Sequence, residues 1–375
     1  MRVLLFFLLF SFTMNSLAQV ENNYNLVDEK MTIIPLSMTN STTEIANYIL
    51  QNFFTESEKI RAVFYWTASN ISYDFEGMFD PFHLDSPEVK IAKTLKSKKG
   101  VCIHYSEVFN DIANRVGIKT YIIAGYSKQN GQIPNESHAW CASKIDGKWY
   151  IIDPTWGSGF IDNKKFTMKL NNAFFMVAPQ KMIQTHMPYD YLWQFLNSPI
   201  KNQEFIEGIV SEENKIYNFD FESEISKYEN LSNEDKVAET AKRVERNGLL
   251  NPKIMEYYNL KNKEYTILIQ NKNIQKLNKV TLKFNAVIGS LNEFISYSNS
   301  KFLPYKPTDE VLKTIEDIKE QFMQCKSEMT TIGEVGKENT PNSTKLKALI
   351  FESIEKSQKI EAFTIDYLGK QKDRN

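Results

Sequence analysis

Cysteine is scarce in this chain of 375 residues, which contains only Cys102, Cys141 and Cys325. Small proteins that depend on disulfides carry many more, and an odd number of thiols cannot all pair within one chain. The sequence therefore excludes a disulfide-stapled framework, and at least one thiol is left free or is paired between molecules. An unpaired thiol raises the question of a chemical role.

The chain also has almost no excess charge, with 45 basic and 46 acidic side chains and a formal net charge of −1. Proteins that bind nucleic acids usually present a basic face, so no nucleic-acid partner is predicted. The hydrophobic share of 42% is ordinary for a globular protein. Because 375 residues exceed what a single core usually serves, we expect two folded parts.

Long apolar runs are absent except at the start. Val3 to Phe12 is apolar apart from Ser11, follows Arg2, and is soon followed by the small residues of Ser16-Leu17-Ala18. This pattern predicts a secretory signal peptide over residues 1–18 with cleavage after Ala18. The run is shorter than the roughly 20 residues that span a bilayer. We therefore expect an exported protein, periplasmic or extracellular, with no transmembrane segment after signal removal.

The rest of the chain divides into three stretches of different character. Residues 19–41 are polar and weakly patterned, and we interpret them as a lead-in segment. Residues 42–205 mix helix and strand signals and predict an α+β domain. Residues 215–375 contain no histidine and predict a mostly α-helical C-terminal domain, which packs on the first domain or binds a protein partner.

Helix starts in the first domain are marked by capping boxes. Ser41 with Glu44, and Thr55 with Glu58, each precede apolar residues at helical spacing. Residues 74–90 contain Gly and Pro among acidic and aromatic side chains and predict a loop. A longer helix is predicted from Cys102 to Val116.

Strand signals follow this helix. Three strands are predicted from branched and aromatic residues, over 119–126, 138–145 and 148–152. The last two are joined by Asp146-Gly147, which is a strong signal for a two-residue β-hairpin turn.

The C-terminal domain is predicted to be helical with two exceptions. Four helices are indicated by caps or apolar faces, beginning near Ser232, Asn251, Val311 and Leu346. A polar break separates the last two over residues 339–343. Residues 265–270 and 279–284 alternate enough to predict short strands.

Cys102 stands at the expected start of a helix, directly after Gly100-Val101. Free backbone N–H groups and the helix dipole favour a negative charge there, and a neighbouring imidazole would favour it further. The Cys102 N–H is also a natural donor to an oxyanion. Taken alone, the thiol is better explained as a small buried side chain, since free cysteine is usually buried.

The hairpin changes that interpretation. If Asp146 and Gly147 form the turn, Trp140 lies opposite Asp153. His138 shares a face with Trp140 because side chains alternate along a strand, so His138 and Asp153 are diagonal neighbours. This spacing suits a carboxylate that orients an imidazole, which together with a thiol forms a Cys–His–Asp arrangement for acyl chemistry. A register shift of one residue would separate the two side chains.

A zinc site is the competing interpretation of these residues. Cys102, His104, His138 and Cys141 have suggestive spacings, but Cys141 has the opposite strand parity from His138 and should face away. Zinc needs ligands that converge at about 2.0–2.3 Å. The sequence therefore predicts no metal site.

Three ordered motifs resemble the transglutaminase-like superfamily. They are Lys99-Gly100-Val101-Cys102, Ser137-His138-Ala139-Trp140 and Asp153-Pro154-Thr155-Trp156. Flanking segments are similar to the kyphoscoliosis-peptidase-like branch and its bacterial relatives: Phe64-Tyr65-Trp66, Asn70-Ile71-Ser72-Tyr73-Asp74, Thr185-His186-Met187-Pro188 and Trp193-Gln194-Phe195-Leu196. The resemblance covers about residues 42–205.

The resemblance implies a papain-like core in which a cysteine-bearing helix packs on an antiparallel sheet. It also implies that Cys102 is the nucleophile, His138 the general base and then acid, and Asp153 the orienting carboxylate, with no cofactor. No calcium-binding loop is evident.

For other residues near these motifs the sequence leaves alternatives open. Trp140 and Trp156 either wall a substrate site or are core aromatics. His104 departs from the family pattern and either lines the cleft or lies on the surface or behind the site. His186 is expected to be structural, hydrogen-bonded and partly buried.

Two functions of different class are compatible with these residues. The first is an exported cysteine enzyme that cleaves or transfers acyl groups on peptide or protein amides through a thioester, where water gives hydrolysis and a primary amine gives cross-linking. The second is a non-catalytic binding or scaffolding protein on the same fold. A role on surface polymers follows from export alone and no residue favours it.

Overall fold

The computed structural model describes residues 24–75, 85–162, 165–208 and 219–372, so the predicted signal peptide lies outside the described residues. The chain forms two compact units. The first contains residues up to 231 together with 239–259, and the second contains residues 232–238 and 260–375. Each unit has its own buried apolar cluster, as expected for a chain of this length.

The predicted capping boxes begin two helices of the first unit. Helix α2 (Thr42–Asn52) starts at Ser41, whose hydroxyl accepts the Glu44 N–H at 3.2 Å. Helix α3 (Glu56–Asn70) starts at Thr55, whose hydroxyl accepts the Glu58 N–H while the Glu58 carboxylate accepts the Thr55 N–H. Both predicted helix starts are confirmed. The caps stabilise these starts because they satisfy backbone N–H donors that a helix end leaves free.

The lead-in segment is more ordered than its sequence pattern suggests. Residues 24–32 are helical, and Val27 and Met31 are buried in the core of the first unit. Asp28 on this helix binds Arg61 of α3 through two bonds, Nε–Oδ1 at 2.8 Å and Nη2–Oδ2 at 2.6 Å. A short 3₁₀ turn, η1 (Leu36–Thr39), follows.

The helix that carries Cys102 begins where the sequence places it. Helix α4 (Pro87–Ser97) occupies the end of the predicted 74–90 loop, so residues 87–90 are helical rather than loop. The short strands β1 (Ser72–Tyr73) and β2 (Lys99–Gly100) pair in parallel and lead into α5 (Cys102–Arg115). Gly117 follows α5 with a φ of +87°, the left-handed conformation expected after a helix.

A four-stranded antiparallel sheet has the order β5-β4-β3-β8. Its strands are β3 (Thr120–Ser127), β4 (His138–Ile145), β5 (Lys148–Ile152) and β8 (His186–Pro188). Asp146 and Gly147 have φ values of 48° and 77°, and Ile145 pairs with Lys148, as predicted from the turn. The register continues to Cys141 opposite Ile152, which places Trp140 level with Asp153.

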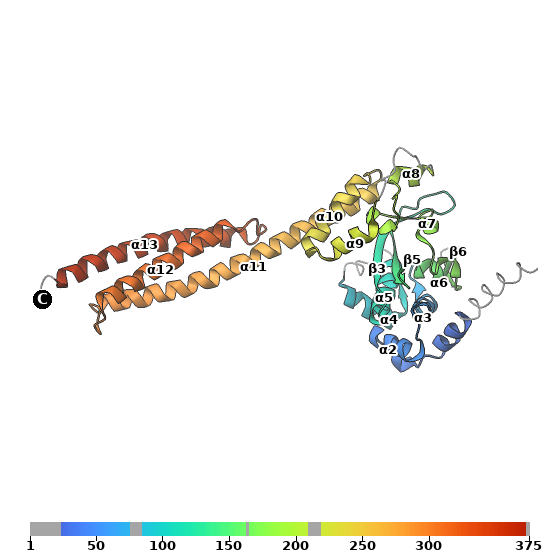
Figure 1. Ribbon diagram of the computed structural model, residues 1–375, viewed down its shortest axis with the longest axis horizontal. Helices are drawn as coiled ribbons and strands as arrows, with labels where there is room; N and C mark the ends of the chain where they lie inside the picture. The colour runs from blue at the N-terminus through green and yellow to red at the C-terminus, as the bar shows by residue number, and fades with distance from the viewer. Residues whose placement is uncertain (1–23, 76–84, 163–164, 209–218, 373–375) are drawn as a thin grey trace, which may run out of the picture. The chain divides into compact units, whose positions relative to one another are not determined.

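Each face of the sheet has a separate apolar core. Cys141, Ile145 and Ile152 join the core that contains the apolar face of α5. Trp140, Ile151 and their neighbours pack into a second cluster with residues that follow the hairpin. Figure 1 shows α5 lying beside the sheet. The predicted α+β architecture, a cysteine-bearing helix packed on an antiparallel sheet, is confirmed.

Shorter elements complete the first unit after β5. They are α6 (Pro154–Ser158), β6 (Gly159–Asp162), β7 (Lys165–Met168), η4 (Asn172–Phe174), α7 (Pro179–Met182), η5 (Tyr191–Gln194), α8 (Asn202–Glu207) and α9 (Phe221–Glu229). Strands β6 and β7 form a separate antiparallel hairpin.

Four long helices follow, as the sequence predicts: α10 (Asn233–Arg246), α11 (Pro252–Asn299), α12 (Thr308–Thr330) and α13 (Thr340–Lys372). The predicted strands over 265–270 and 279–284 are wrong, since both segments lie within α11. Buried apolar residues recur here at spacings of three and four: Leu277, Val280, Phe284, Val287 and Leu291. This helical period determines the structure, and the short local alternation does not. The predicted break at 339–343 is also displaced, because α13 already begins at Thr340.

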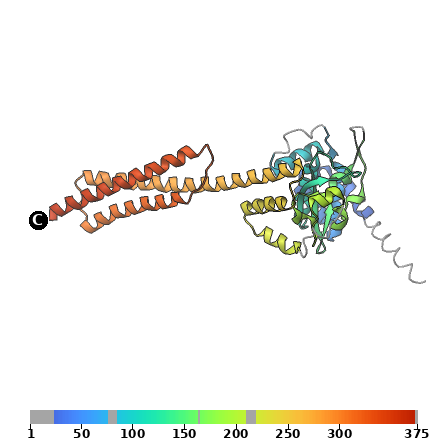
Figure 2. The same ribbon diagram turned by 90° about the horizontal axis from the view of Figure 1, so that it is seen from above.

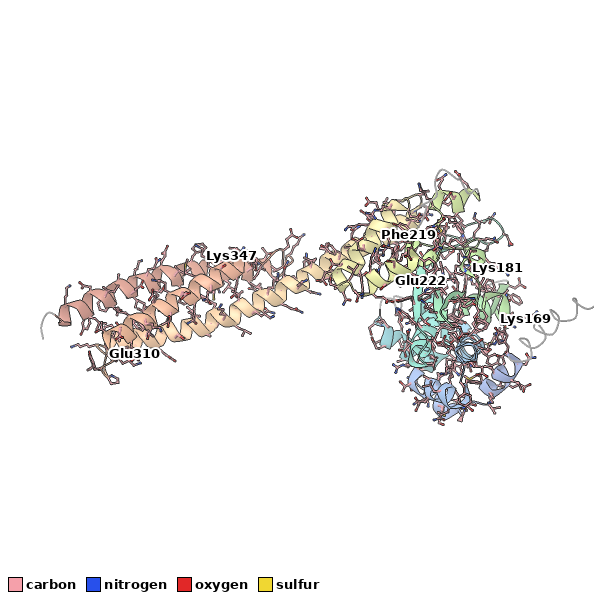
Figure 3. The ribbon with its side chains drawn as sticks, in the orientation of Figure 1. Lys169, Lys181, Phe219, Glu222, Glu310 and Lys347 are labelled. Carbon is pink, nitrogen blue, oxygen red and sulfur yellow. The ribbon has the colours of Figure 1, made fainter. Side chains whose placement is uncertain are left out.

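In the second unit, α11, α12 and α13 run side by side in both views (Figure 1, Figure 2). Their buried apolar side chains form one shared core. Figure 3 shows Glu310 and Lys347 on the outside of this bundle, where both are exposed. None of the helices within the described residues is long and apolar enough to cross a membrane.

Candidate active site

Asp153 is the residue that joins the sheet to α6. It follows β5 and serves as the N-cap of α6, where its Oδ1 accepts the backbone N–H groups of Thr155 at 2.8 Å and Trp156 at 3.0 Å. Pro154 occupies the first helical position, which needs no N–H donor. The carboxylate is completely buried, so these two donors hold its orientation in the absence of solvent.

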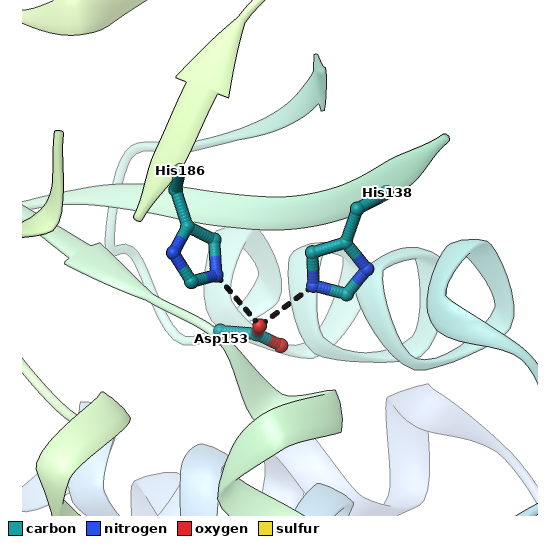
Figure 4. A group of neighbouring side chains, drawn as sticks. All are labelled: His138, Asp153 and His186. Atoms are coloured by element: carbon teal, nitrogen blue, oxygen red, sulfur yellow. Dashed lines mark hydrogen bonds and ion pairs between the residues drawn. The ribbon is translucent and has the colours of Figure 1, made fainter. Parts of the chain in front are cut away.

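The second carboxylate oxygen faces His138. His138 Nε2 lies 2.7 Å from Asp153 Oδ2 (Figure 4). The two residues come from neighbouring strands of the predicted hairpin, and the observed register accounts for their approach. With Nε2 engaged by Asp153, the other ring nitrogen of His138 points away from the carboxylate (Figure 4).

Cys102 is the first residue of α5, and its side chain is partly exposed whereas Cys141 and Cys325 are buried. Free backbone N–H groups at this helix end favour a negative charge. Cys102 also lies close enough to His138 to interact with the ring by hydrogen bonding and charge. The structure therefore brings the three residues Cys102, His138 and Asp153 together.

The buried pair of His138 and Asp153 is strongly polarised. Burial alone would lower the pKa of His138, but the Asp153 charge and hydrogen bond, with Cys102, raise that pKa to about 10. Burial would raise the pKa of Asp153, yet His138, followed by His186, holds it well below its usual range. At neutral pH the arrangement is an imidazolium bound to a carboxylate.

His186 is a further member of the cluster. Its Nε2 lies 3.1 Å from the same Asp153 Oδ2, and its Nδ1 lies 2.8 Å from the Thr185 hydroxyl. The sequence predicts a hydrogen-bonded structural histidine here and gives no sign of its partner. His186 is 33 residues from Asp153 and comes from a different edge of the sheet, so no local spacing could have found the contact.

The residues assigned to substrate contact occupy different positions. Trp156 is partly exposed and stacks on the His138 ring, with centroids 5.4 Å apart. Trp140 is 1% exposed and lies 5.8 Å from the same ring. His104 is buried and its Nδ1 accepts the Val101 N–H at 3.0 Å, so the surface alternative is wrong, and a place in the cleft or behind the site remains. Contact of any of the three with substrate stays a prediction.

A comparison with known proteins assigns the domain. The sequence profile of the transglutaminase-like superfamily matches residues 43–154. This part of the chain belongs to the transglutaminase-like superfamily. The matched stretch spans the helices before Cys102, α5 itself, and the hairpin up to Pro154, and so contains Cys102, His138 and Asp153, whereas His186 lies beyond it.

Relatives of the transglutaminase-like domain include two named peptidases. The kyphoscoliosis peptidase of Mus musculus is 29% identical over 191 residues, covering 49% of this chain and 28% of that protein. The kyphoscoliosis peptidase of Homo sapiens is 30% identical over 200 residues, covering 51% and 30%. The chain thus spans less than a third of these relatives. A solved structure of "a TGase" is 20% identical and covers 44% of this chain and 41% of that chain, with a TM-score of 0.24, which is too low to add weight.

The histidines and the carboxylate of the transglutaminase-like domain also form a set of metal-ligand type. Among the described residues, His138, Asp153 and His186 offer ligand atoms that all lie within 4.8 Å of one another. Two of the separations between these atoms, His138 Nε2–Asp153 Oδ2 at 2.7 Å and His186 Nε2–Asp153 Oδ2 at 3.1 Å, are hydrogen-bond distances. Cys141 does not converge on this point, because its thiol donates to the Ser106 carbonyl.

Proposed function

We propose that the protein is a cysteine-dependent acyl-transfer enzyme that acts on peptide or protein amides through a thioester. Cys102 is the nucleophile, His138 the general base and acid, and Asp153 the orienting carboxylate. The observation that carries the proposal is the 2.7 Å bond between His138 Nε2 and Asp153 Oδ2, because it fixes the ring and leaves Nδ1 for the thiol at the start of α5.

The reaction would run in two halves. The Cys102 thiolate attacks the amide carbonyl carbon, and the resulting oxyanion collapses as the carbon–nitrogen bond breaks. The departing amine takes the proton from His138 Nδ1, which leaves a thioester on Cys102 and a neutral imidazole. A water molecule or a primary amine then gives its proton to His138 and attacks the thioester, and the thiolate leaves with the imidazolium restored.

Electrostatics support this cycle in the resting state. His138 is buried beside Asp153, and its raised pKa keeps the ring protonated at neutral pH. An imidazolium next to Cys102 favours the thiolate, as does the N-terminal end of α5. The backbone N–H of Cys102, at the first position of α5, would donate to the oxyanion that forms at the attacked carbonyl.

The identity of the acceptor separates two outcomes of the same chemistry. We propose hydrolysis, because an exported enzyme meets abundant water, and because the two curated relatives above are named peptidases. Incubation with a mixture of peptides, with and without an added primary amine, and mass analysis of the products distinguishes them. Shortened or deamidated peptides indicate hydrolysis, whereas amine adducts indicate transfer.

The role of Cys102 is tested directly by substitution. We expect Cys102→Ala to abolish product formation, and Cys325→Ala, which changes a thiol buried in the helical bundle, to leave it unchanged. Full activity in Cys102→Ala would overturn the proposal.

A second test needs no substrate. Iodoacetamide should alkylate Cys102 at neutral pH about tenfold faster in the unmodified protein than in His138→Ala, because a neighbouring imidazolium favours the reactive thiolate. The same Cys102 in the variant is the proper reference, because Cys141 and Cys325 are shielded by burial. Equal rates would instead favour a non-catalytic binding protein on this fold.

We also propose that residues 1–18 direct export. The pattern that supports this is a positive start, an apolar run and small residues before the expected cut. Mass analysis of the mature N-terminus after expression should find the chain beginning at Gln19, and an intact N-terminus in a soluble cell extract would contradict the proposal.

A further inference from the structure

Two imidazoles share one oxygen of a completely buried carboxylate. His138 Nε2 and His186 Nε2 lie 2.7 and 3.1 Å from Asp153 Oδ2 (Figure 4). We propose that His186 is a positioning residue, a neutral N–H donor that fixes Asp153 so that the carboxylate can hold His138 in its working orientation. This inference rests on the proposed catalytic roles of Cys102, His138 and Asp153.

The donors around Asp153 match its capacity to accept. Oδ1 takes two backbone N–H groups from α6, and Oδ2 takes one N–H from each histidine. A carboxylate offers about four acceptor sites, so these four hydrogen bonds fill them. Because Asp153 is fully buried, the loss of any donor leaves a lone pair that water does not reach.

The contacts of His186 determine which of its nitrogens carries the proton. The Asp153 carboxylate accepts only, so Nε2 must be the donor in that bond. Thr185 Oγ1 then gives its proton to Nδ1 at 2.8 Å, and its 3.3 Å approach to the Met182 carbonyl is the weaker alternative. The neutral Nε2–H tautomer satisfies both ring nitrogens at once.

Within the described part of the chain, His138 and His186 are the groups bonded to this carboxylate that can carry a positive charge. Tyr73, Tyr105 and Cys141 are further described groups in electrostatic reach of Asp153, and burial raises the pKa of each, so they stay neutral. Burial lowers the pKa of His186, and the charge on His138 lowers it further, against the pull of Asp153. The two rings therefore differ in charge at neutral pH: His138 is protonated and His186 is neutral.

Packing holds the His186 ring away from substrate. Its centroid lies 4.5 Å from that of Trp156 and 5.0 Å from that of Trp140, and the residue is 2% exposed. The cavity that it helps to line has a volume of about 10 Å³, enough for no more than one water molecule. His186 thus cannot touch a peptide, and any effect on the reaction must pass through Asp153.

The loss of this donor should be visible in a pH profile. The hydrogen bond from His186 is one cause of the low pKa of Asp153, so its removal makes the carboxylate easier to protonate. A protonated Asp153 no longer holds the proton on His138, and the thiolate of Cys102 loses its counter-charge. The acid limb of Cys102 reactivity should therefore move to higher pH.

The experiment compares two substitutions of equal disruption to ring packing. His186→Leu removes the donor, and His186→Gln keeps an N–H at the position of Nε2. We expect the acid limb of iodoacetamide alkylation at Cys102 to shift up by about one pH unit in His186→Leu, slowing the reaction about tenfold below the midpoint. His186→Gln should stay within about twofold of the unmodified protein, while a purely structural role would affect both alike.

The outcomes separate this inference from the proposed function. If His138→Ala slows alkylation and both His186 variants match the unmodified protein, or both shift equally, the positioning role is wrong and the triad stands. If His138→Ala has no effect, the proposed function itself fails. Thr185→Val provides a second variant should the others not fold, since it removes the hydroxyl bonded to His186 Nδ1 and so loosens the hold on the ring, and a shift in the same direction is expected. An unchanged acid limb in Thr185→Val counts against the proposal.

Discussion

Trp156 covers one face of the His138 ring. Their centroids are 5.4 Å apart and their planes are inclined by 28°, and the backbone N–H of Trp156 donates to Asp153 Oδ1. The same carboxylate therefore anchors the imidazole through Oδ2 and the residue stacked on it through Oδ1. One buried aspartate can therefore set the positions of both rings, His138 and Trp156.

Alkaline pH should destabilise the first unit through His138. Its pKa is raised from 6.5 to about 10 in the folded state, so the protein gains stability that is fully present below 6.5 and is lost as the pH rises through about 10. The urea midpoint should fall over this window. Tryptophan fluorescence measures it selectively, because the tryptophans all lie in the first unit: Trp66, Trp140, Trp149, Trp156 and Trp193.

Asp153→Asn is the matched control for this pH dependence. It keeps the size of the side chain and removes the charge that raises the His138 pKa, so its midpoint should fall less steeply over the same window. Parallel slopes in the two proteins would mean that His138 is not held charged by Asp153.

Acid should destabilise the same unit through His186. The pKa of His186 is lowered below 6.5 in the folded state. Its contribution to the free energy of unfolding is therefore fully present above pH 6.5. That contribution is lost as the pH falls below 6.5, because the unfolded chain takes up the proton first. His186→Gln has no titrating ring and should lose stability less steeply between neutral pH and the range where carboxylates protonate. A slope identical to that of the unmodified protein would show that His186 is readily protonated in the folded state.

The buried ion pair of Asp28 and Arg61 should stabilise the first unit. Arg61 is 1% exposed and binds both oxygens of Asp28, so Asp28→Asn leaves a buried guanidinium without its counter-charge. We expect the free energy of unfolding to fall by about 3 kcal/mol. This is the lower end of the range for breaking a buried ion pair, because the Asp28 side chain is 16% exposed.

Asp85→Asn is the control for this experiment. It breaks the solvent-exposed pair with Lys93 and should change stability by less than about 1 kcal/mol. Urea unfolding followed by tryptophan fluorescence compares the two variants, and equal effects would mean that the buried pair of Asp28 and Arg61 stabilises the fold no more than a surface pair does.

The helix caps could be predicted accurately because each depends on neighbouring residues alone. The Ser41 and Thr55 caps begin helices since a hydroxyl three residues before a free N–H satisfies it locally. The helical content of residues 215–375 was predictable in outline for a similar reason. The strands expected over 265–270 and 279–284 failed because a window of six residues cannot distinguish alternation from part of a helical stripe.

The sequence by itself determined the pairing of His138 with Asp153. A two-residue turn at Asp146-Gly147 and the period of two along a strand leave one register, and the bond at 2.7 Å follows from it. Only the tertiary structure decided that His186 joins them. That contact depends on β8 pairing with β3 at the far side of the sheet from β5, and no spacing along the chain encodes the approach of segments 33 residues apart.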